Sequence, residues 1–468
     1  MNRFFSFLAM ASAAALTLFG CKSPEPDPVP VGAEFAVTNA LGEPATQFQA
    51  AAGGEVISLS VRSNVAWSAE APGWVAVSPS TGDGDSAVSL TVSENTGGAR
   101  TGDVTFKYEG GSSKVTVEQA APAAKGIASA ADFVAFARAV NAGESTEAWE
   151  NAEGWVNLLA DLDFAGVTDF EPVGHVTAPW DSYNPVVKDG HPFTGKFDGN
   201  AHHIKNLKLT CAESEAGRHF GLFGYLGPGA IVQNFVIDEN CSLTVTASVS
   251  MSVGLIAGVV YDATIRDVTS YAPMTYNGGA TGYFHMALIG GLYAKDEGCI
   301  VDSVHNRGAI TAENSANLNA GATGLHVAGI VGFANAPTGN DKRNVISDCS
   351  NHGEMISQAG RTAGILGAAN ACTDLVNCEN RGNQLNTMPK NDGTRLGNIV
   401  CFTNNGSSIT GCKNYGDLIS TTAGRVGGIV SLPNAGEYTN NENYGEIISD
   451  SQYRGVFFGY VTQFFMAA

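Results

Sequence analysis

Charged residues are scarce in this chain, and basic residues are the scarcest of them. Lysine and arginine together number 25 among 468 residues, against 45 aspartates and glutamates, so the formal net charge is −20 at pH 7. A protein that neutralises nucleic-acid phosphates or adheres to anionic lipid needs a basic face. The composition therefore argues against a nucleic-acid partner and against membrane attachment through basic side chains.

Long apolar runs are also missing, apart from one at the N-terminus. The apolar stretch after Arg3 is too short for a comfortable membrane span, and we interpret residues 1–20 as an export signal. It ends in Leu18-Phe19-Gly20-Cys21, which resembles a bacterial lipobox with an unusual phenylalanine. The resemblance implies lipidation at Cys21 and an outer-membrane lipoprotein at the cell surface; an ordinary signal peptide with a chance cysteine is the alternative. The proline-rich residues 21–32 predict a stiff tether.

Helical periodicity is rare in a sequence with 57 glycines, and after the signal it is convincing in one place. Residues 121–127 break the strand pattern and predict a linker, and residues 128–145 predict one amphipathic helix. Ser129 and Asp132 form a capping box at its start. Because the helix stands directly before a repeat array, we expect it to cover the unpaired end of that array.

Apolar and polar residues alternate with a period of two in residues 33–120. Stretches such as GEVISLSV, SAVSLTV and SKVTVEQ predict short strands separated by turns, and together they predict an immunoglobulin-like β-sandwich. The segment also resembles the BACON domain in the order and spacing of Trp67-Ser68, Gly73-Trp74-Val75, Val77-Ser78-Pro79-Ser80, Gly82, Asn95, Arg100 with Gly102, and Val115-Thr116-Val117-Glu118-Gln119.

The BACON resemblance implies an all-β sandwich of the kind found in surface and secreted lipoproteins. It also implies carbohydrate as a binding partner. Trp67 and Trp74 are the candidate ligand-binding residues in this segment, because an exposed indole ring can stack on a sugar. Packing in the core or at the rim of the sandwich is the alternative for both tryptophans.

Two linked signatures repeat through residues 146–468. A glycine-and-aliphatic tetrapeptide recurs 27 to 42 residues apart, starting at Gly221, Gly254, Ala287, Gly329, Gly364, Asn398, Gly428 and Gly455. A second tetrapeptide, of the form aliphatic, any, small polar, apolar, starts at Ile204, Val232, Ile265, Val301, Ile346, Leu375, Ile409 and, in degraded form, Tyr438. Each unit is too small to bury a core alone, so the units must stack. The short strands and glycine or asparagine corners predict an all-β solenoid, a right-handed parallel β-helix.

Stacking places equivalent residues of successive units in columns. Five copies of the second signature continue into Asn-x-Gly, and we expect these asparagine amides to hydrogen-bond along the axis, with a ligand-binding ladder as the alternative. They are Asn306, Asn351, Asn380, Asn414 and Asn443. Cys349, Cys378 and Cys412 share another column with ordinary apolar residues. A free thiol packs like a small apolar group, so we predict reduced, buried cysteines rather than a disulfide framework.

The repeat array resembles the GLUG-repeat modules of bacterial surface proteins. The resemblance is carried by WVNLLADLDFAG, FEPVG and FTGKFDGNAHHIKNLKL ahead of FGLFGYL, and it spans about residues 150–468. It implies β-helical modules of surface proteins and adhesins, and it implies no particular reaction.

Residue patterns for catalysis or metal binding are not evident. Asp267 and Asp348 share a column with Asn, Ser and Gly, which is typical of a turn position rather than of paired catalytic acids. Asp161 and Asp163 lack the other ligands of a calcium loop, and the adjacent His202 and His203 lack zinc-protease spacing. We therefore expect no cofactor, no metal and no catalytic residue.

One polar insertion is the main candidate for recognition. Residues 175–193, HVTAPWDSYNPVVKDGHPF, place Trp180, Tyr183 and His191 between two β-helix segments, where a rigid scaffold can present them to a ligand. Aromatic side chains that fold back onto the first coil are the alternative.

The sequence favours a non-catalytic surface lipoprotein that binds carbohydrate or a host or cell-surface macromolecule, in the manner of an adhesin. Two alternatives of different classes stay open. One is a glycan-degrading β-helix enzyme, either a lyase or a glycoside hydrolase, which would need a cluster of carboxylates. The other is a purely structural spacer, which would lack an exposed recognition patch.

Overall fold

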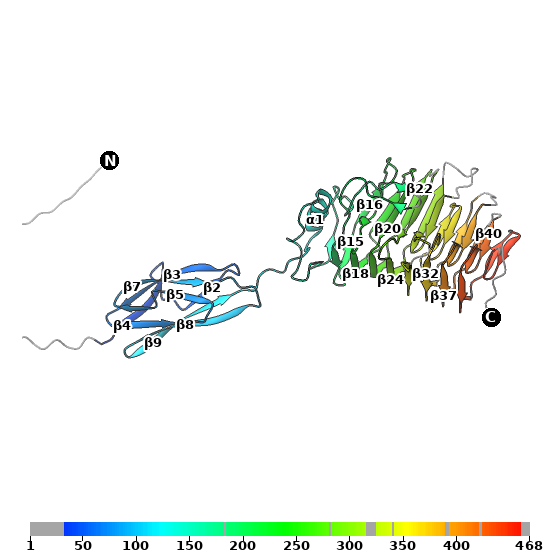
Figure 1. Cartoon of the computed structure of the whole chain (residues 1–468). Helices are drawn as coiled ribbons and strands as arrows, with labels where there is room; N and C mark the ends of the chain where they lie inside the picture. The colour runs from blue at the N-terminus through cyan, green and yellow to red at the C-terminus, as the bar shows by residue number, and fades with distance from the viewer. Residues whose placement is uncertain are drawn as a thin grey trace, which may run out of the picture. The chain divides into compact units, whose positions relative to one another are not determined.

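A computed structural model describes residues 32–181, 184–279, 282–314, 324–338, 341–388, 393–420 and 424–459. It divides the chain into two compact units, Met1–Ala123 and Ala124–Ala468 (Figure 1). Nearly all the regular structure in these ranges is β, which confirms the predicted all-β class. The predicted signal peptide, Cys21 and most of the tether lie outside the described residues. Within them, no helix is long and apolar enough to cross a membrane.

The first unit is a sandwich of two sheets. One sheet has the order β1(Phe35–Asn39), β3(Glu55–Ser63), β7(Ser86–Val92), β5(Val75–Ser78). The other has the order β2(Gln47–Ala50), β9(Gly111–Gln119), β8(Arg100–Tyr108), β4(Ala66–Glu70), β6(Thr81–Asp83). Alternate residues such as Leu90, Val104 and Phe106 are fully buried between the sheets. The period-two pattern therefore produced the predicted sandwich.

Helix α1(Ala130–Ala142) opens the second unit. The Ser129 Oγ accepts a hydrogen bond from the Asp132 backbone N–H at 3.1 Å, so the predicted N-cap is present. Gly143 ends the helix in the left-handed conformation, a little before the predicted end at residue 145. Phe133 and Phe136 are fully buried, and Phe133 packs edge-on against Phe197 and Phe223 of the coils. The helix thus covers the first coils, as predicted.

The remainder of the second unit is a parallel β-helix whose strands form three faces (Figure 1). The first face contains β10(Trp155–Asn157), β14(Lys196–Asp198), β18(Ile231–Ile237), β21(Thr264–Ser270), β24(Cys299–Asn306), β28(Asn344–Ser347), β32(Thr373–Val376), β37(Ser408–Thr410) and β42(Glu437–Thr439), with β11(Leu162–Asp163), β15(His203–Lys205), β29(Ser350–Asn351), β33(Glu379–Asn380), β38(Lys413–Asn414) and β43(Glu442–Asn443) beside them.

The second face runs through β16(Lys208–Cys211), β19(Ser242–Val245), β22(Met274–Gly278), β25(Ile310–Asn314), β30(Met355–Ser357), β34(Gln384–Asn386), β39(Leu418–Ser420) and β44(Ile447–Ser449). The third face runs through β17(Phe223–Leu226), β20(Met251–Tyr261), β23(Phe284–Tyr293), β26(Leu325–Ala328), β31(Arg361–Ala363), β35(Arg395–Gly397), β40(Arg425–Gly427) and β45(Tyr453–Gly455), with β27(Val331–Asn335) on β23 and the pair β36(Val400–Thr403) and β41(Val430–Pro433). A short hairpin of β12(Trp180–Asp181) and β13(Asn184–Pro185) lies outside these faces in the strand order.

Successive coils stack in register, as the repeats predicted. Ile265 pairs with Val301, Val301 with Ile346, and Ile346 with Leu375, and all four are fully buried in the tube. The small polar position of the second signature has a positive φ of 51° to 68° in every copy, at Asn206, Asn234, Asp267, Ser303, Asp348, Asn377, Gly411 and Asn440. This confirms that Asp267 and Asp348 occupy a turn position, because Asn, Asp and Gly tolerate that conformation best.

The cysteine column is also confirmed. Cys349, Cys378 and Cys412 are buried, carry free thiols and lie in successive coils, because the Cys349 carbonyl accepts from Glu379 and the Cys378 carbonyl from Lys413. The Cys378 thiol donates to the backbone carbonyls of Ile346 at 3.4 Å and Val376 at 3.5 Å. All eight cysteines in the described ranges are free.

The five asparagines of Asn-x-Gly form a ladder inside the tube, which we call the inner ladder. Each Nδ2 donates to the Oδ1 of the next asparagine, at 2.7 Å from Asn306, 2.9 Å from Asn351, 2.8 Å from Asn380 and 2.6 Å from Asn414. Each Nδ2 also donates to the carbonyl of the glycine two residues later. The inner ladder therefore binds the coils to one another.

Candidate functional site

Trp67 lies in the core of the sandwich. Its side chain is only 4% exposed, its Nε1 donates to the Gly84 carbonyl at 2.9 Å, and its ring lies against Gly82. No ring face is available for a sugar in this position. Trp67 therefore packs in the core rather than binding a ligand. A buried indole whose N–H is hydrogen-bonded contributes to the stability of the domain.

Trp74 is half-buried at the rim of the sandwich. The Arg100 guanidinium lies over its ring, with the Arg100 Cζ 4.6 Å from the ring centroid, and the ring also contacts Gly102. Arg100 therefore occupies one face of the indole by a cation–π contact.

The insertion at residues 175–193 forms the β12–β13 hairpin. Trp180 belongs to β12, but its side chain and the whole of Tyr183 lie outside the described residues. His191 is exposed, and its ring rests against Gly143 at the end of helix α1. Asn184 of this hairpin is not among the residues predicted from the sequence, and its side chain accepts a hydrogen bond from Asn335 in a later coil.

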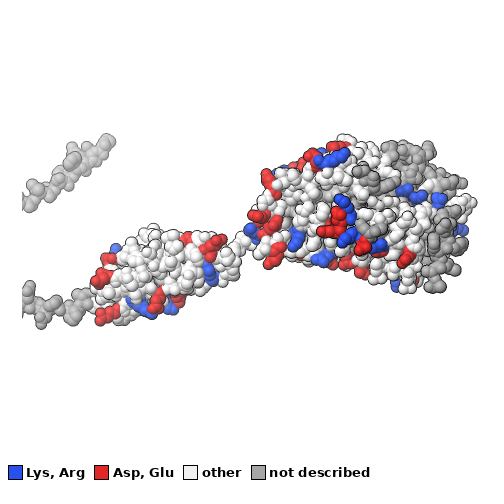
Figure 2. Space-filling model, in the orientation of Figure 1, with Lys and Arg blue, Asp and Glu red and all other residues white. Residues whose placement is uncertain are grey.

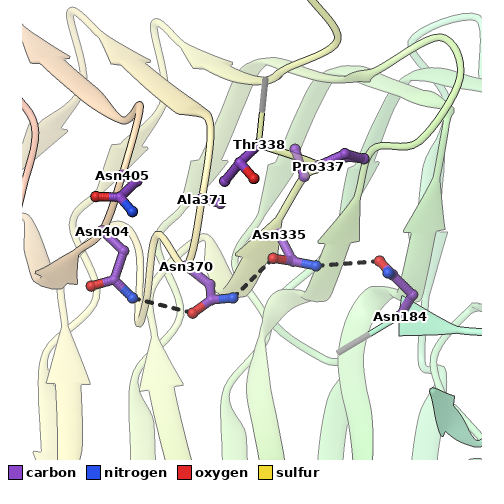
Figure 3. Close-up of a pocket in the computed structure, with 9 residues that line it drawn as sticks. Asn184, Asn335, Pro337, Thr338, Asn370, Ala371, Asn404 and Asn405 are labelled. Carbon is purple, nitrogen blue, oxygen red and sulfur yellow. Dashed lines mark hydrogen bonds between the residues drawn. The ribbon is translucent and has the colours of Figure 1, made fainter. Parts of the chain in front are cut away.

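Asn184 joins a second row of asparagines on the outside of the tube, which we call the outer ladder (Figure 3). Nδ2 of Asn335 donates to Oδ1 of Asn184 at 3.2 Å, although the two residues are 151 positions apart. Nδ2 of Asn370 donates to Asn335 at 2.9 Å, and Nδ2 of Asn404 to Asn370 at 3.2 Å. Asn434 continues the row, with Nδ2 donating to Asn404 at 2.9 Å.

The outer ladder forms part of a pocket of about 390 Å³. The other lining residues are Ala336, Pro337, Thr338, Ala371 and Asn405, so no ionisable side chain lines it. Within the ladder, Asn370 and Asn404 each use one N–H donor and one acceptor position for their neighbours. An asparagine amide has two donors and two acceptor positions, so one of each remains per coil for a ligand.

A sequence signal for the outer ladder existed but was not recognised. Asn335, Asn370, Asn404 and Asn434 each stand five residues after the first aliphatic of their tetrapeptide, at Ile330, Ile365, Ile399 and Ile429. In the preceding coils the same column holds Tyr261 and Tyr293, so the position is variable through the whole array and constant only in the last coils.

One pair of side chains, Ser252 and His285, resembles a catalytic serine–histidine pair but is buried. Ser252 Oγ lies 3.2 Å from His285 Nδ1, but Ser252 is fully buried and His285 is 2% exposed. Burial lowers the pKa of His285 well below its usual value, which favours the neutral ring. Because neither side chain reaches solvent, the pair has no route to a substrate in this conformation.

Asp161 and Asp163 make polar contacts at the turns beside the first face. Lys205 Nζ lies 2.8 Å from Asp161 Oδ2, and this contact lowers the pKa of Asp161. Asp163 Oδ1 accepts from the Ala165 backbone N–H at 2.9 Å and from Asn206 Nδ2 at 2.8 Å. His203 lies against a different carboxylate, Asp238. In the ranges that the structure covers, no three His, Cys, Asp or Glu residues are grouped to hold a metal ion.

Charge is mixed on the surface. On the face drawn in Figure 2, lysine and arginine lie among acidic side chains rather than gathered in one basic area. Exposed ion pairs such as Lys107 with Glu70 and Lys413 with Glu442 account for part of this mixing. Recognition by a neutral pocket is consistent with such a surface.

Comparison with known proteins covers parts of the chain. Halomucin from Haloquadratum walsbyi is 29% identical over 133 residues, which is 27% of this chain and 1% of halomucin, so the chain spans a very small part of that protein. A solved GH5 xyloglucanase from Bacteroides ovatus, in complex with a XXXG heptasaccharide, shares 20% identity over 20% of each chain with a TM-score of 0.18. Residues 65–120 match the BACON family, "Putative binding domain, N-terminal". Within the N-terminal sandwich, residues 65–120 are therefore similar to a BACON domain.

Proposed function

We propose that this protein is a non-catalytic surface lipoprotein that binds a neutral, hydroxyl-rich glycan in the outer-ladder pocket. One observation carries the proposal: four coils present asparagine amides in a row, with donor and acceptor positions still available beside a pocket without charge. A sugar hydroxyl both donates and accepts, so it complements an amide that offers one of each.

The spacing and rigidity of the pocket also favour a chain-like ligand. Neighbouring coils are about 4.8 Å apart, so the outer ladder repeats its donor and acceptor pair on the scale of one sugar ring. The asparagines hold one another by hydrogen bonds and stand on stacked strands, so little side-chain freedom is lost on binding. The pocket has no carboxylate or ammonium partner for an ionic ligand.

The rest of the chain supports display at a surface. The BACON match describes a binding domain, and the lipobox-like Cys21 and its proline-rich tether would anchor the protein to the outer membrane at the cell surface. A GLUG-like β-helix would serve as an adhesin module. A host or cell-surface macromolecule would be recognised through the glycan that it carries.

A glycan array tests the proposal. The mature chain with Cys21→Ala, which removes the lipid site, is applied to neutral and acidic oligosaccharides. We expect binding to neutral members, a loss of at least about tenfold in affinity with Asn370→Ala, and little change with Trp67→Ala at a temperature where that variant is folded. Binding that Asn370→Ala leaves intact would reject the pocket.

The two alternatives predict other results in the same experiment. A lyase or glycoside hydrolase would shorten a polysaccharide on prolonged incubation, which a reducing-end assay detects. A structural spacer would bind no glycan at all.

A further inference from the structure

The groove that contains the outer ladder is filled in the earlier coils. Tyr261 pairs with Tyr293, and Tyr293 pairs with Asn335, so these three residues share one column of the third face. Tyr293 is fully buried, and it packs in one apolar cluster with Val176 and Ala178 of the insertion. The column is therefore covered by the insertion up to Tyr293, and the asparagines begin in the next coil.

The insertion is attached firmly to the coils beneath it. Tyr225 donates its hydroxyl to the Pro185 carbonyl at 2.9 Å, and the Ala178 backbone N–H donates to the Gly217 carbonyl at 2.8 Å. His219 Nε2 donates to the Ala178 carbonyl at 2.9 Å. Because these contacts involve buried residues of the coils, the hairpin is held in a fixed position against the β-helix.

The exposure of the outer ladder increases away from the hairpin. Asn335, bonded to Asn184, is only 8% exposed, Asn370 and Asn404 are half-buried, and Asn434 is exposed. Figure 3 shows Asn184 at one end of the row and Asn404 toward the other. The row of amides is thus closed at Asn184 and open at Asn434.

We infer that the pocket is blind at Asn184 and accepts the end of a glycan chain rather than its middle. The inference rests on the proposed function, because it concerns the same pocket. The terminal sugar lies against Asn184 and Asn335, and the rest of the chain leaves along Asn370 and Asn404 toward Asn434. A sugar in the middle of a polymer would have to continue through the space that the hairpin occupies.

Orientation of the ligand provides the test. Hexasaccharides of β-glucan, xylan, mannan and galactan are immobilised in two ways, through the reducing end and through the opposite end, and the Cys21→Ala chain is applied to both. We expect binding in one presentation and a loss of at least about tenfold in the other, because the attached end cannot enter the closed part of the pocket. Equal binding in both presentations, with loss in Asn370→Ala, would overturn the inference and leave the proposed function standing.

Two variants test the closed end and the open end of the pocket separately. Asn184→Ala removes the contact to Asn335 and shortens the barrier, so we expect the ratio between the two presentations to fall at least about threefold. Asn434→Ala is the matched control at the open end, and it should weaken both presentations equally. An unchanged ratio in Asn184→Ala, with thermal unfolding like that of the parent chain, would contradict the assignment of Asn184 as the barrier. Absence of binding to every hexasaccharide would reject the pocket and the inference together.

Discussion

Asn351 and Asn380 lie one coil apart, and Nδ2 of Asn351 donates to Oδ1 of Asn380 at 2.9 Å with both side chains fully buried. Asn370 and Asn335 form the same bond at the same distance at the edge of a pocket, where Asn370 is half-buried. The chemistry is identical and the surroundings differ. We therefore expect the inner ladder to determine stability and the outer ladder to determine binding.

Asn380→Ala should destabilise the β-helix strongly. Asn380 donates to the Gly382 carbonyl at 3.0 Å and to Asn414 at 2.8 Å, and it accepts from Asn351, so its removal leaves buried polar groups without partners. We expect a loss of about 3 kcal/mol in the free energy of unfolding. Asn404→Ala on the outer ladder is the matched control and should cost less than about 1 kcal/mol, because water can replace its bonds. Similar losses in chemical denaturation would contradict the division between the ladders.

Gly382→Ala should be still more damaging. A Cβ at Gly382 would come within 1.9 Å of the Gly353 carbonyl oxygen of the preceding coil, so the two coils would have to separate. We expect a loss above about 4 kcal/mol, seen as a large fall in the thermal midpoint or as failure to fold. Gly229→Ala is the control: its Cβ meets open space, and its φ of +79° costs only about 1 kcal/mol of backbone strain. Equal stability of the two variants would show that the Asn-x-Gly glycine is not required for coil contact.

The interior of the β-helix could be predicted because each coil is the environment of the next. An inward position such as Ile346 lies between Val301 and Leu375, so its size and polarity are constrained on both sides and the repeat becomes visible in the sequence. The inner ladder and the cysteine column were predictable for the same reason. Positive φ at the corners limited the residue choice further, as at Asn377.

The outer pocket could not be predicted in the same way. It depends on Asn184 in an insertion meeting Asn335, which no local pattern or repeat period connects. Trp67 was a misleading guide because indole rings serve both binding and packing, and its ring is buried in the core of the sandwich. Site residues on the outside of a solenoid are free to vary, so their columns are short.

The cysteine column predicts thiols that are chemically protected in the folded protein. The neighbouring Cys349 and burial raise the pKa of Cys378, and the thiolate is the reactive form. We expect the described cysteines to resist a thiol reagent until the chain is denatured. Cys378→Val should cost less than about 1.5 kcal/mol, because valine occupies the same column at Val268 and Val304, whereas Cys378→Ser should cost about 2 kcal/mol by burying a hydroxyl. Rapid labelling of the native chain would contradict the packing.

We expect the folded protein to lose stability in acid because of His219. Its ring is fully buried, Nδ1 accepts from the Ser252 backbone N–H at 3.0 Å and Nε2 donates to the Ala178 carbonyl, so the neutral ring is satisfied on both sides. Burial lowers the pKa of His219 to about 4. Since the unfolded chain titrates near pH 6.5, it binds the proton first as the pH falls, and folding stability is therefore full above about pH 6.5 and decreases toward about pH 4.

The expected loss from this histidine is about 3 kcal/mol over that interval, since each pKa unit corresponds to about 1.4 kcal/mol. His219→Gln tests it, because a glutamine amide can donate to Ala178 and accept from Ser252 but cannot take up a proton in this range. The stability of the variant, measured by denaturation at several pH values, should fall less steeply than that of the parent by about that amount. Carboxylates titrate in both proteins and cancel in the comparison. Parallel curves for the two proteins would mean that His219 does not hold the insertion to the coils as a neutral ring, and the fixed barrier at Asn184 would lose one of its supports.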